Sequence, residues 1–179
     1  MAEIDHGVAR LRLLSASRAV GWVDYGALSL PCAIGPSGVR ACKRESDGAT
    51  PRVLLPVREV LYRAGRVRRP RTPLLVRPLR PDDGWCDEKL DRNYNRPVRL
   101  PYTASAETLW RQDNLYDVIL VMGFNDLPRV RGRGSCIFMH IARPGLTPTE
   151  GCVALAYDDL IRLIEARVPM RALDTRLAR

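Results

Sequence analysis

One cysteine and one histidine in the sequence have types and spacing suited to covalent acyl transfer. His140 ends the apolar stretch Cys136 to His140, whose strand-like alternation puts Cys136, Phe138 and His140 on one face. Cys152 follows after a turn-rich segment. In thiol acyl transfer the cysteine attacks a carbonyl while a histidine takes its proton. The structural alternative stays open, because cysteine is among the most buried residue types and a lone strand histidine is commonly a core or surface residue.

The residues around Cys152 favour a reactive thiol. Gly151 permits a sharp turn, so backbone N–H groups near the cysteine can point at one oxyanion. An amphipathic helix is predicted over Tyr157–Arg167, because its apolar residues share one face. The positive end of a helix dipole stabilises a thiolate, so this nearby helix predicts a lowered pKa for Cys152.

Most of the chain is predicted to form short strands separated by turns. Rough apolar alternation predicts a strand at Val8–Leu14, and short apolar stretches bounded by turn residues predict two strands within Ala19–Ile34 and one each at Val53–Tyr62, Tyr116–Phe124 and Ser135–Ile141. An extended connection is predicted over residues 63–83 and a polar loop over 87–99. Ala104–Arg111 is compatible with a short helix capped by Thr103 or Ser105. The predicted fold class is therefore mainly β, with one long helix near the C-terminal end.

The composition limits the class of protein. With 179 residues, 46% of them apolar, the chain is predicted to form a single domain over residues 1–179. Its longest apolar run, Val118 to Phe124, falls far short of the ~20 residues that span a membrane. The net charge of +9 comes almost wholly from arginine and suits an anionic partner, such as nucleic acid, an acidic membrane face or an acidic wall polymer.

Several common kinds of site are excluded by the sequence. It contains no GxxxxGK[ST], GxGxxG, GxSxG or HExxH motif, and neither lysine follows a serine at the spacing of an SxxK nucleophile. The five cysteines are too widely spaced for a zinc knuckle, and only two histidines are present. No metal and no cofactor are therefore expected.

Two segments resemble the active-site signature of a known family. Gly134 to His140 and Thr149 to Leu155 are similar to the signature of the L,D-transpeptidase catalytic domain, the YkuD family. That signature is a histidine, a loop, then Ser/Thr-His-Gly-Cys, a hydrophobic residue and asparagine. Upstream, Lys43 to Pro51 is similar to the family's K-x-E-G-D-G-x-T-P strand and turn. Glu150 and Ala154 depart from the signature, where the family has histidine and asparagine.

The resemblance extends over most of the chain, from about Ala19 to Leu163. Residues similar to those of a short-loop subgroup stand at Gly84–Asp87, Tyr94-Asn95, Tyr116-Asp117 and Asn125-Asp126. The resemblance implies a YkuD-type β-sandwich of mixed sheets, with a helix after the catalytic cysteine.

The resemblance also implies a reaction. Cys152 would attack the bond between an L-centre and D-alanine in a peptidoglycan tetrapeptide stem, and D-alanine would leave. His140, oriented by a backbone carbonyl, would move the proton, and N–H groups at Gly151 and Cys152 would hold the oxyanion. An amine of an acceptor stem would then resolve the thioester into a 3-3 or 1-3 cross-link.

Four further residues are implied to contact the substrate: Thr149, Trp85, Tyr94 and Asn95. Each has a structural alternative. Thr149 can brace its turn through its hydroxyl, the aromatic side chains can be packed in the core, and Asn95 can be an ordinary loop amide.

By resemblance the partners are donor and acceptor stem peptides in the bacterial cell envelope or periplasm, and a carbapenem-class β-lactam is an expected covalent inhibitor. No nucleic acid is expected, because no aromatics alternate with the arginines of residues 63–71. No secretory signal is visible in Met1 to Val20. Two alternatives stay open: an L,D-carboxypeptidase with the same Cys–His pair, and a non-catalytic basic module that binds a polyanion.

Overall fold

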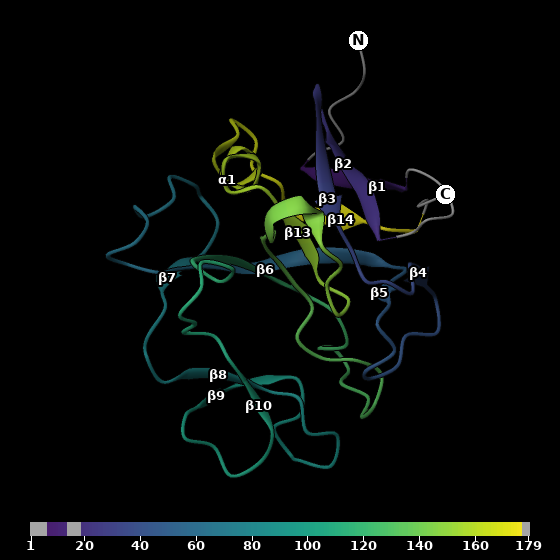
Figure 1. Ribbon diagram of the computed structural model, residues 1–179, viewed down its shortest axis with the longest axis vertical. Helices are drawn as coiled ribbons and strands as arrows, with labels where there is room; N and C mark the ends of the chain where they lie inside the picture. The colour runs from purple at the N-terminus through teal and green to yellow at the C-terminus, as the bar shows by residue number, and fades with distance from the viewer. Residues whose placement is uncertain (1–6, 14–18, 177–179) are drawn as a thin grey trace.

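Short strands make up most of the structure, a computed structural model that describes residues 7–13 and 19–176 (Figure 1). The strands are β1 (Val8–Leu13), β2 (Val20–Tyr25), β3 (Leu28–Ala33), β4 (Val39–Arg40), β5 (Thr50–Pro51), β6 (Leu54–Tyr62), β7 (Val76–Pro78), β8 (Asp83–Cys86), β9 (Arg96–Arg99), β10 (Ala106–Thr108), β11 (Val118–Met122), β12 (Phe138–Ile141), β13 (Val153–Leu155) and β14 (Ala172–Asp174). The helical elements are α1 (Tyr157–Glu165) and a 3-10 turn at Pro144–Leu146. Leu14 and much of the segment inspected for a secretory signal lie outside the described residues.

The largest sheet has nine strands in the order β11-β12-β13-β3-β2-β1-β14-β6-β7 and mixes parallel with antiparallel pairs. Because β11 also pairs with β6, this sheet folds over and returns to itself around an apolar interior. Two smaller sheets are β4-β5 and β10-β8-β9. The prediction of a mainly β fold with mixed sheets and a helix late in the chain is confirmed.

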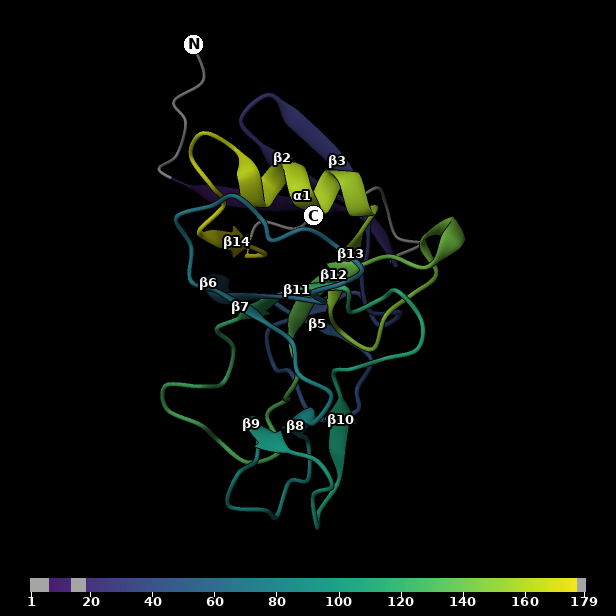
Figure 2. The ribbon, with the colours of Figure 1, turned by 90° about the vertical axis from the view of Figure 1, so that its left-hand side faces the viewer.

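Strands β11, β12 and β13 are buried on both faces, and the alternation of their side chains divides them between two apolar cores. Met139 and Val153 point into the main core, which also contains Leu163 of α1. Phe138 and Cys152 belong to a second cluster on the opposite face. Figures 1 and 2 show α1 on one side of these strands and the β10-β8-β9 sheet on the other.

The β10-β8-β9 sheet covers the second cluster and differs from the sequence prediction. The helix predicted over Ala104–Arg111 is wrong, because Ala106–Thr108 forms β10, antiparallel to β8, with Glu107 opposite Trp85. Helix propensity is a weak preference that long-range strand pairing overrides. The Trp85 ring packs edge-on against Phe138 with centroids 5.3 Å apart, which anchors this sheet to β12.

Other segments also differ from the predictions. The polar loop predicted over residues 87–99 contains β9, and the connection predicted over 63–83 contains β7 and the start of β8. These short strands carry little apolar alternation of their own and form by pairing, β7 with β6 and β9 with β8. Strand β12 begins at Phe138 rather than Ser135, because Cys136 adopts a left-handed φ of 53° that interrupts a strand.

Candidate active site

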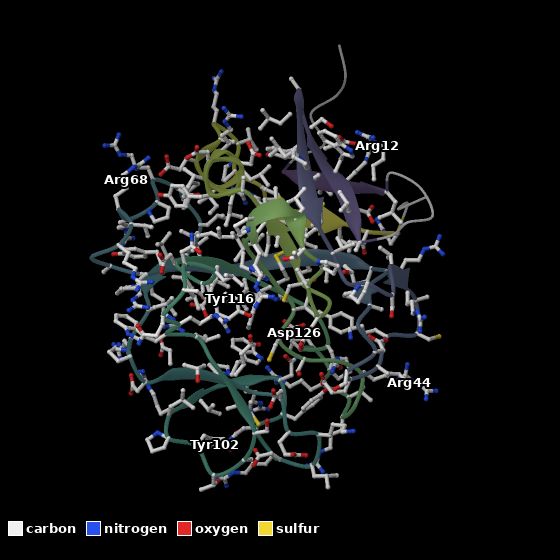
Figure 3. The ribbon with its side chains drawn as sticks, viewed as in Figure 1. Arg12, Arg44, Arg68, Tyr102, Tyr116 and Asp126 are labelled. Atoms are coloured by element: carbon white, nitrogen blue, oxygen red, sulfur yellow. The ribbon has the colours of Figure 1, made fainter. Side chains whose placement is uncertain are left out.

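Parallel pairing of β12 with β13 brings His140 and Cys152 together. Met139 is the register partner of Val153, so Cys152 lies level with Phe138, and His140 is the next residue of β12 on that same face. Both side chains line one cavity of about 590 Å³. Figure 3 shows Tyr116, another lining residue, between the main sheet and the β10-β8-β9 sheet. The two candidate reactive groups therefore share a cavity at the junction of two sheets.

The Cys152 thiol is buried and uncharged at neutral pH. The Phe138 N–H donates to Sγ at 3.3 Å, and the thiol donates to the Cys136 carbonyl at 3.1 Å. Burial, reinforced by the negative charge of Glu107, raises the pKa of Cys152 to about 12. The prediction of a lowered pKa is wrong, because β13 separates Cys152 from the first turn of α1 and keeps the helix dipole away from the sulfur.

His140 is held as a neutral base. Its Nδ1 lies 2.9 Å from the Ile141 carbonyl oxygen, which can only accept a hydrogen bond. Nδ1 therefore carries the proton, and Nε2 has a free lone pair. Burial lowers the pKa of His140 to about 4, although the hydrogen bond to Ile141 opposes that shift. The Cys152 thiol and the His140 imidazole are therefore both uncharged at neutral pH.

The turn before Cys152 depends on glycine and threonine. Gly151 adopts a φ of +130°, and a Cβ added there would lie 2.6 Å from the Ala49 carbonyl oxygen. The Gly151 N–H donates to Thr149 Oγ1 at 3.2 Å, and the Thr149 hydroxyl donates to the Cys152 carbonyl at 2.6 Å. Thr149 braces the turn and also lines the cavity. These contacts fix the backbone that carries the thiol.

Asn95 connects Trp85 of β8 to the backbone of Cys136, which in turn contacts the Cys152 thiol. Its Oδ1 accepts from Trp85 Nε1 at 2.9 Å and from the Cys136 N–H at 3.3 Å. Its Nδ2 donates to the carbonyls of Phe124 and Asn125. Since the Cys136 carbonyl accepts the thiol hydrogen bond, Asn95 fixes the segment that orients the sulfur.

Tyr94 is a second buried support. Its hydroxyl donates to the Glu45 carboxylate and accepts from the Gly134 N–H at 2.9 Å. Trp85, Tyr94 and Asn95 are buried and are not among the residues that line the cavity. Their contacts in the structure are with the protein itself, whereas Thr149 is open to a substrate.

Glu107 is a cavity residue that the sequence analysis missed. It lies on β10, within the stretch interpreted as a helix, and burial raises its pKa. The Tyr116 hydroxyl donates to its carboxylate, and the Tyr116 ring packs against His140 with centroids 5.1 Å apart. Lys43, Arg111 and Arg143 also line the cavity. No spacing in the sequence signals this set, because strand pairing brings it together from distant segments.

Comparison with protein families matches residues 14–170 to the L,D-transpeptidase catalytic domain of the YkuD family. The chain belongs to the YkuD family. The match includes both Cys152 and His140, and members of this family act on peptidoglycan stem peptides. Comparisons with curated proteins and with solved structures give no match.

The described part of this YkuD domain offers no ready place for a metal. Residues 7–13 and 19–176 contain no group of three or more His, Cys, Asp or Glu side chains that could hold an ion. Among the same residues, no helix is both long and apolar enough to cross a membrane.

Replacing Glu107 with glutamine is expected to make Cys152 more reactive toward iodoacetamide at pH 8. Glutamine keeps an acceptor for the Tyr116 hydroxyl but removes the negative charge that raises the thiol pKa, so the thiolate fraction increases. The rate of alkylation at Cys152, followed by mass spectrometry of the proteolytic peptide that contains it, should rise several-fold. Glu150→Gln is the matched control: Glu150 also raises the pKa of Cys152, but it is exposed and its effect is the smaller one. An unchanged rate in Glu107→Gln would contradict the assigned effect.

Proposed function

We propose that the protein is a peptidoglycan L,D-transpeptidase of the bacterial cell envelope, with Cys152 as nucleophile and His140 as base. One observation carries the proposal. The thiol and the imidazole lie on one face of two paired parallel strands and line the same cavity, and the His140 Nδ1 contact with Ile141 leaves Nε2 free. The chain's membership of the YkuD family, whose members act on peptidoglycan stem peptides, supports the proposed substrate class.

The first half-reaction forms a thioester. Sγ of Cys152 bonds to the carbonyl carbon that precedes the terminal D-alanine of a tetrapeptide donor, and the thiol proton passes to Nε2 of His140. The tetrahedral intermediate then collapses, the C–N bond breaks, and His140 returns the proton to the leaving nitrogen. The products are free D-alanine and a donor stem esterified to the sulfur.

Backbone N–H groups stabilise the charge that develops on the carbonyl oxygen. The N–H of Cys152 and that of Gly151 are the proposed donors. Before substrate binds, the Gly151 N–H is engaged with Thr149 Oγ1. The oxyanion is a stronger acceptor than a hydroxyl and is expected to replace it.

The second half-reaction transfers the stem. An amine of an acceptor stem attacks the thioester carbon, and His140 takes a proton from this amine. The C–S bond then breaks and His140 returns the proton to the sulfur, which gives a 3-3 or 1-3 cross-link and the free thiol. Attack by water instead would give a trimmed tripeptide, the product of an L,D-carboxypeptidase. The same thiol is the proposed site of acylation by a carbapenem-class β-lactam.

The proposed function predicts that Cys152→Ala abolishes all products formed from purified disaccharide-tetrapeptide. Mass spectrometry of the wild-type reaction should detect cross-linked dimers and free D-alanine, and fragmentation of the dimers identifies the linkage. The alanine variant should leave the substrate unchanged while keeping the wild-type fold by circular dichroism.

Other outcomes decide between the alternatives. Tripeptide without dimer would make the protein a carboxypeptidase. Unchanged substrate with the wild-type chain, and no thioester on Cys152, would overturn the enzymatic proposal. Salt-dependent polyanion binding unaffected by Cys152→Ala would then support the basic binding module.

A further inference from the structure

Two arginines lie at the His140 side of the cavity. The Arg111 guanidinium lies 5.3 Å from the centroid of the Tyr116 ring, and that ring in turn lies 5.1 Å from the His140 ring. Arg143 lies two residues after the end of β12, which carries His140. Both arginines line the cavity. Burial is the main cause of the low pKa of His140, and both arginines lower it further, which places their charges within electrostatic reach of the imidazole.

The two arginines differ in whether an acidic side chain already pairs with the guanidinium. Arg111 forms a two-pronged ion pair with Asp113, at 2.8 and 2.7 Å. Lys43, the third cation of the cavity, is paired with Asp47 at 2.6 Å. The Arg143 side chain is exposed and makes no hydrogen bond or ion pair with residues 7–13 or 19–176. Within the described chain, Arg143 is therefore the cavity cation available to an anion.

The reaction requires an anion near this point. His140 protonates the leaving nitrogen, so that nitrogen must lie at Nε2 when the C–N bond breaks. In a stem that ends at the leaving residue, the neighbouring carbon of that residue bears a free carboxylate. The carboxylate must then lie within a few ångströms of the imidazole, in the cavity that Arg111 and Arg143 also line.

We propose that Arg143, with Arg111 beside it, binds the free carboxylate of the D-amino acid that leaves the donor stem. The assignment rests on the proposed transpeptidase function and names a specificity determinant for it. A guanidinium binds a carboxylate through charge-assisted, often paired hydrogen bonds, and neutral groups cannot replace both the charge and the geometry. A longer or amidated stem places a neutral amide at this point, so the subsite selects donors that end one residue after the cleaved bond.

The test compares two donors with four proteins. The donors are disaccharide-tetrapeptide with a free terminal carboxylate and the same compound with a terminal carboxamide. The proteins are the wild-type chain, Arg143→Gln, Arg143→Lys and Arg131→Gln. The last is a control that removes an exposed arginine outside the cavity. Release of D-alanine or D-alaninamide gives kcat/KM for each combination.

The wild-type chain is expected to prefer the free acid by about 10- to 100-fold, the range for loss of one charge-assisted hydrogen bond. In Arg143→Gln this preference should fall below about 3-fold, because kcat/KM drops far more for the acid than for the carboxamide. Arg143→Lys should recover part of the preference, and Arg131→Gln should retain all of it.

Two results would overturn the assignment alone: an acid preference that Arg143→Gln leaves intact, or equal losses on both donors, which would mark a structural role. Turnover of neither donor by the wild-type chain would instead overturn the proposed function together with this subsite. The two failures are distinguishable because the carboxamide donor reports chemistry at Cys152 independently of the carboxylate.

Discussion

Acylation of Cys152 is expected to slow by about 10²- to 10⁴-fold when His140 is replaced by asparagine, the loss typical of removing a general base. The asparagine Nδ2 can replace Nδ1 as donor to the Ile141 carbonyl, so the variant keeps that contact and loses only the base at Nε2. Because the thiol pKa is raised to about 12, almost no thiolate forms near pH 7 without a base. Single-turnover acylation by disaccharide-tetrapeptide or a carbapenem, followed by intact mass, measures the effect.

The pH dependence of the wild-type chain gives a second readout for His140. A base with a pKa of about 4 stays unprotonated as the pH falls from 8 to about 5 and loses function only as the pH approaches 4. Acylation should therefore be nearly independent of pH between about 5.5 and 8. An acid limb near the ordinary histidine value of about 6.5, or near-wild-type acylation in His140→Asn, would contradict the neutral-pair description.

Replacing Gly151 with alanine is expected to reduce acylation by about 10²-fold, the loss that follows from a shift of about 1 Å in a reacting group. A φ of +130° is a conformation that L side chains rarely adopt, and the added Cβ would meet the Ala49 carbonyl oxygen at 2.6 Å. Backbone cannot give way as a flexible side chain can, so the turn must move and carry Cys152 with it. The stability to urea should also fall, by about 1–3 kcal/mol.

Gly26→Ala is the matched control for this prediction. Gly26 has a positive φ of +58°, but a Cβ there would meet nothing within 4 Å. It lies in the turn between β2 and β3. The control should lose about 1–2 kcal/mol of stability through the backbone alone and keep wild-type acylation. Equal acylation in Gly151→Ala and Gly26→Ala would contradict the importance of the close approach to Ala49.

Apolar periodicity in the sequence predicted the elements that form the main core. The apolar stretches Val53–Tyr62 and Tyr116–Phe124 correspond to β6 and β11, and the apolar face of Tyr157–Arg167 corresponds to α1. These segments bury enough apolar surface that their pattern reflects their environment. Strands β8, β9 and β10 could not be predicted in this way. Each has only three or four residues, and their stability comes from pairing with one another and from Trp85 packing on Phe138.

The sequence by itself determined which residues were candidates for the chemistry. Residue type, Gly151 before Cys152, and the resemblance to a family signature were sufficient to single out His140 and Cys152, since these features are local. The tertiary structure decided their protonation states. Burial depends on all the segments that enclose a group. Here it raises the pKa of the Cys152 thiol and lowers the pKa of the His140 imidazole. For Cys152 this is the opposite of the lowered pKa that the nearby helix predicted.

Only the tertiary structure decided the rest of the cavity. Glu107, Arg111 and Arg143 come from β10, the segment before β11 and the loop after β12, and no local pattern distinguishes them from other surface charges. Strand pairing and packing across long sequence separations determine which charges meet at one site. The sequence specified the reactive pair, and the folding of β10-β8-β9 over β12 and β13 specified the electrostatic environment in which the pair lies.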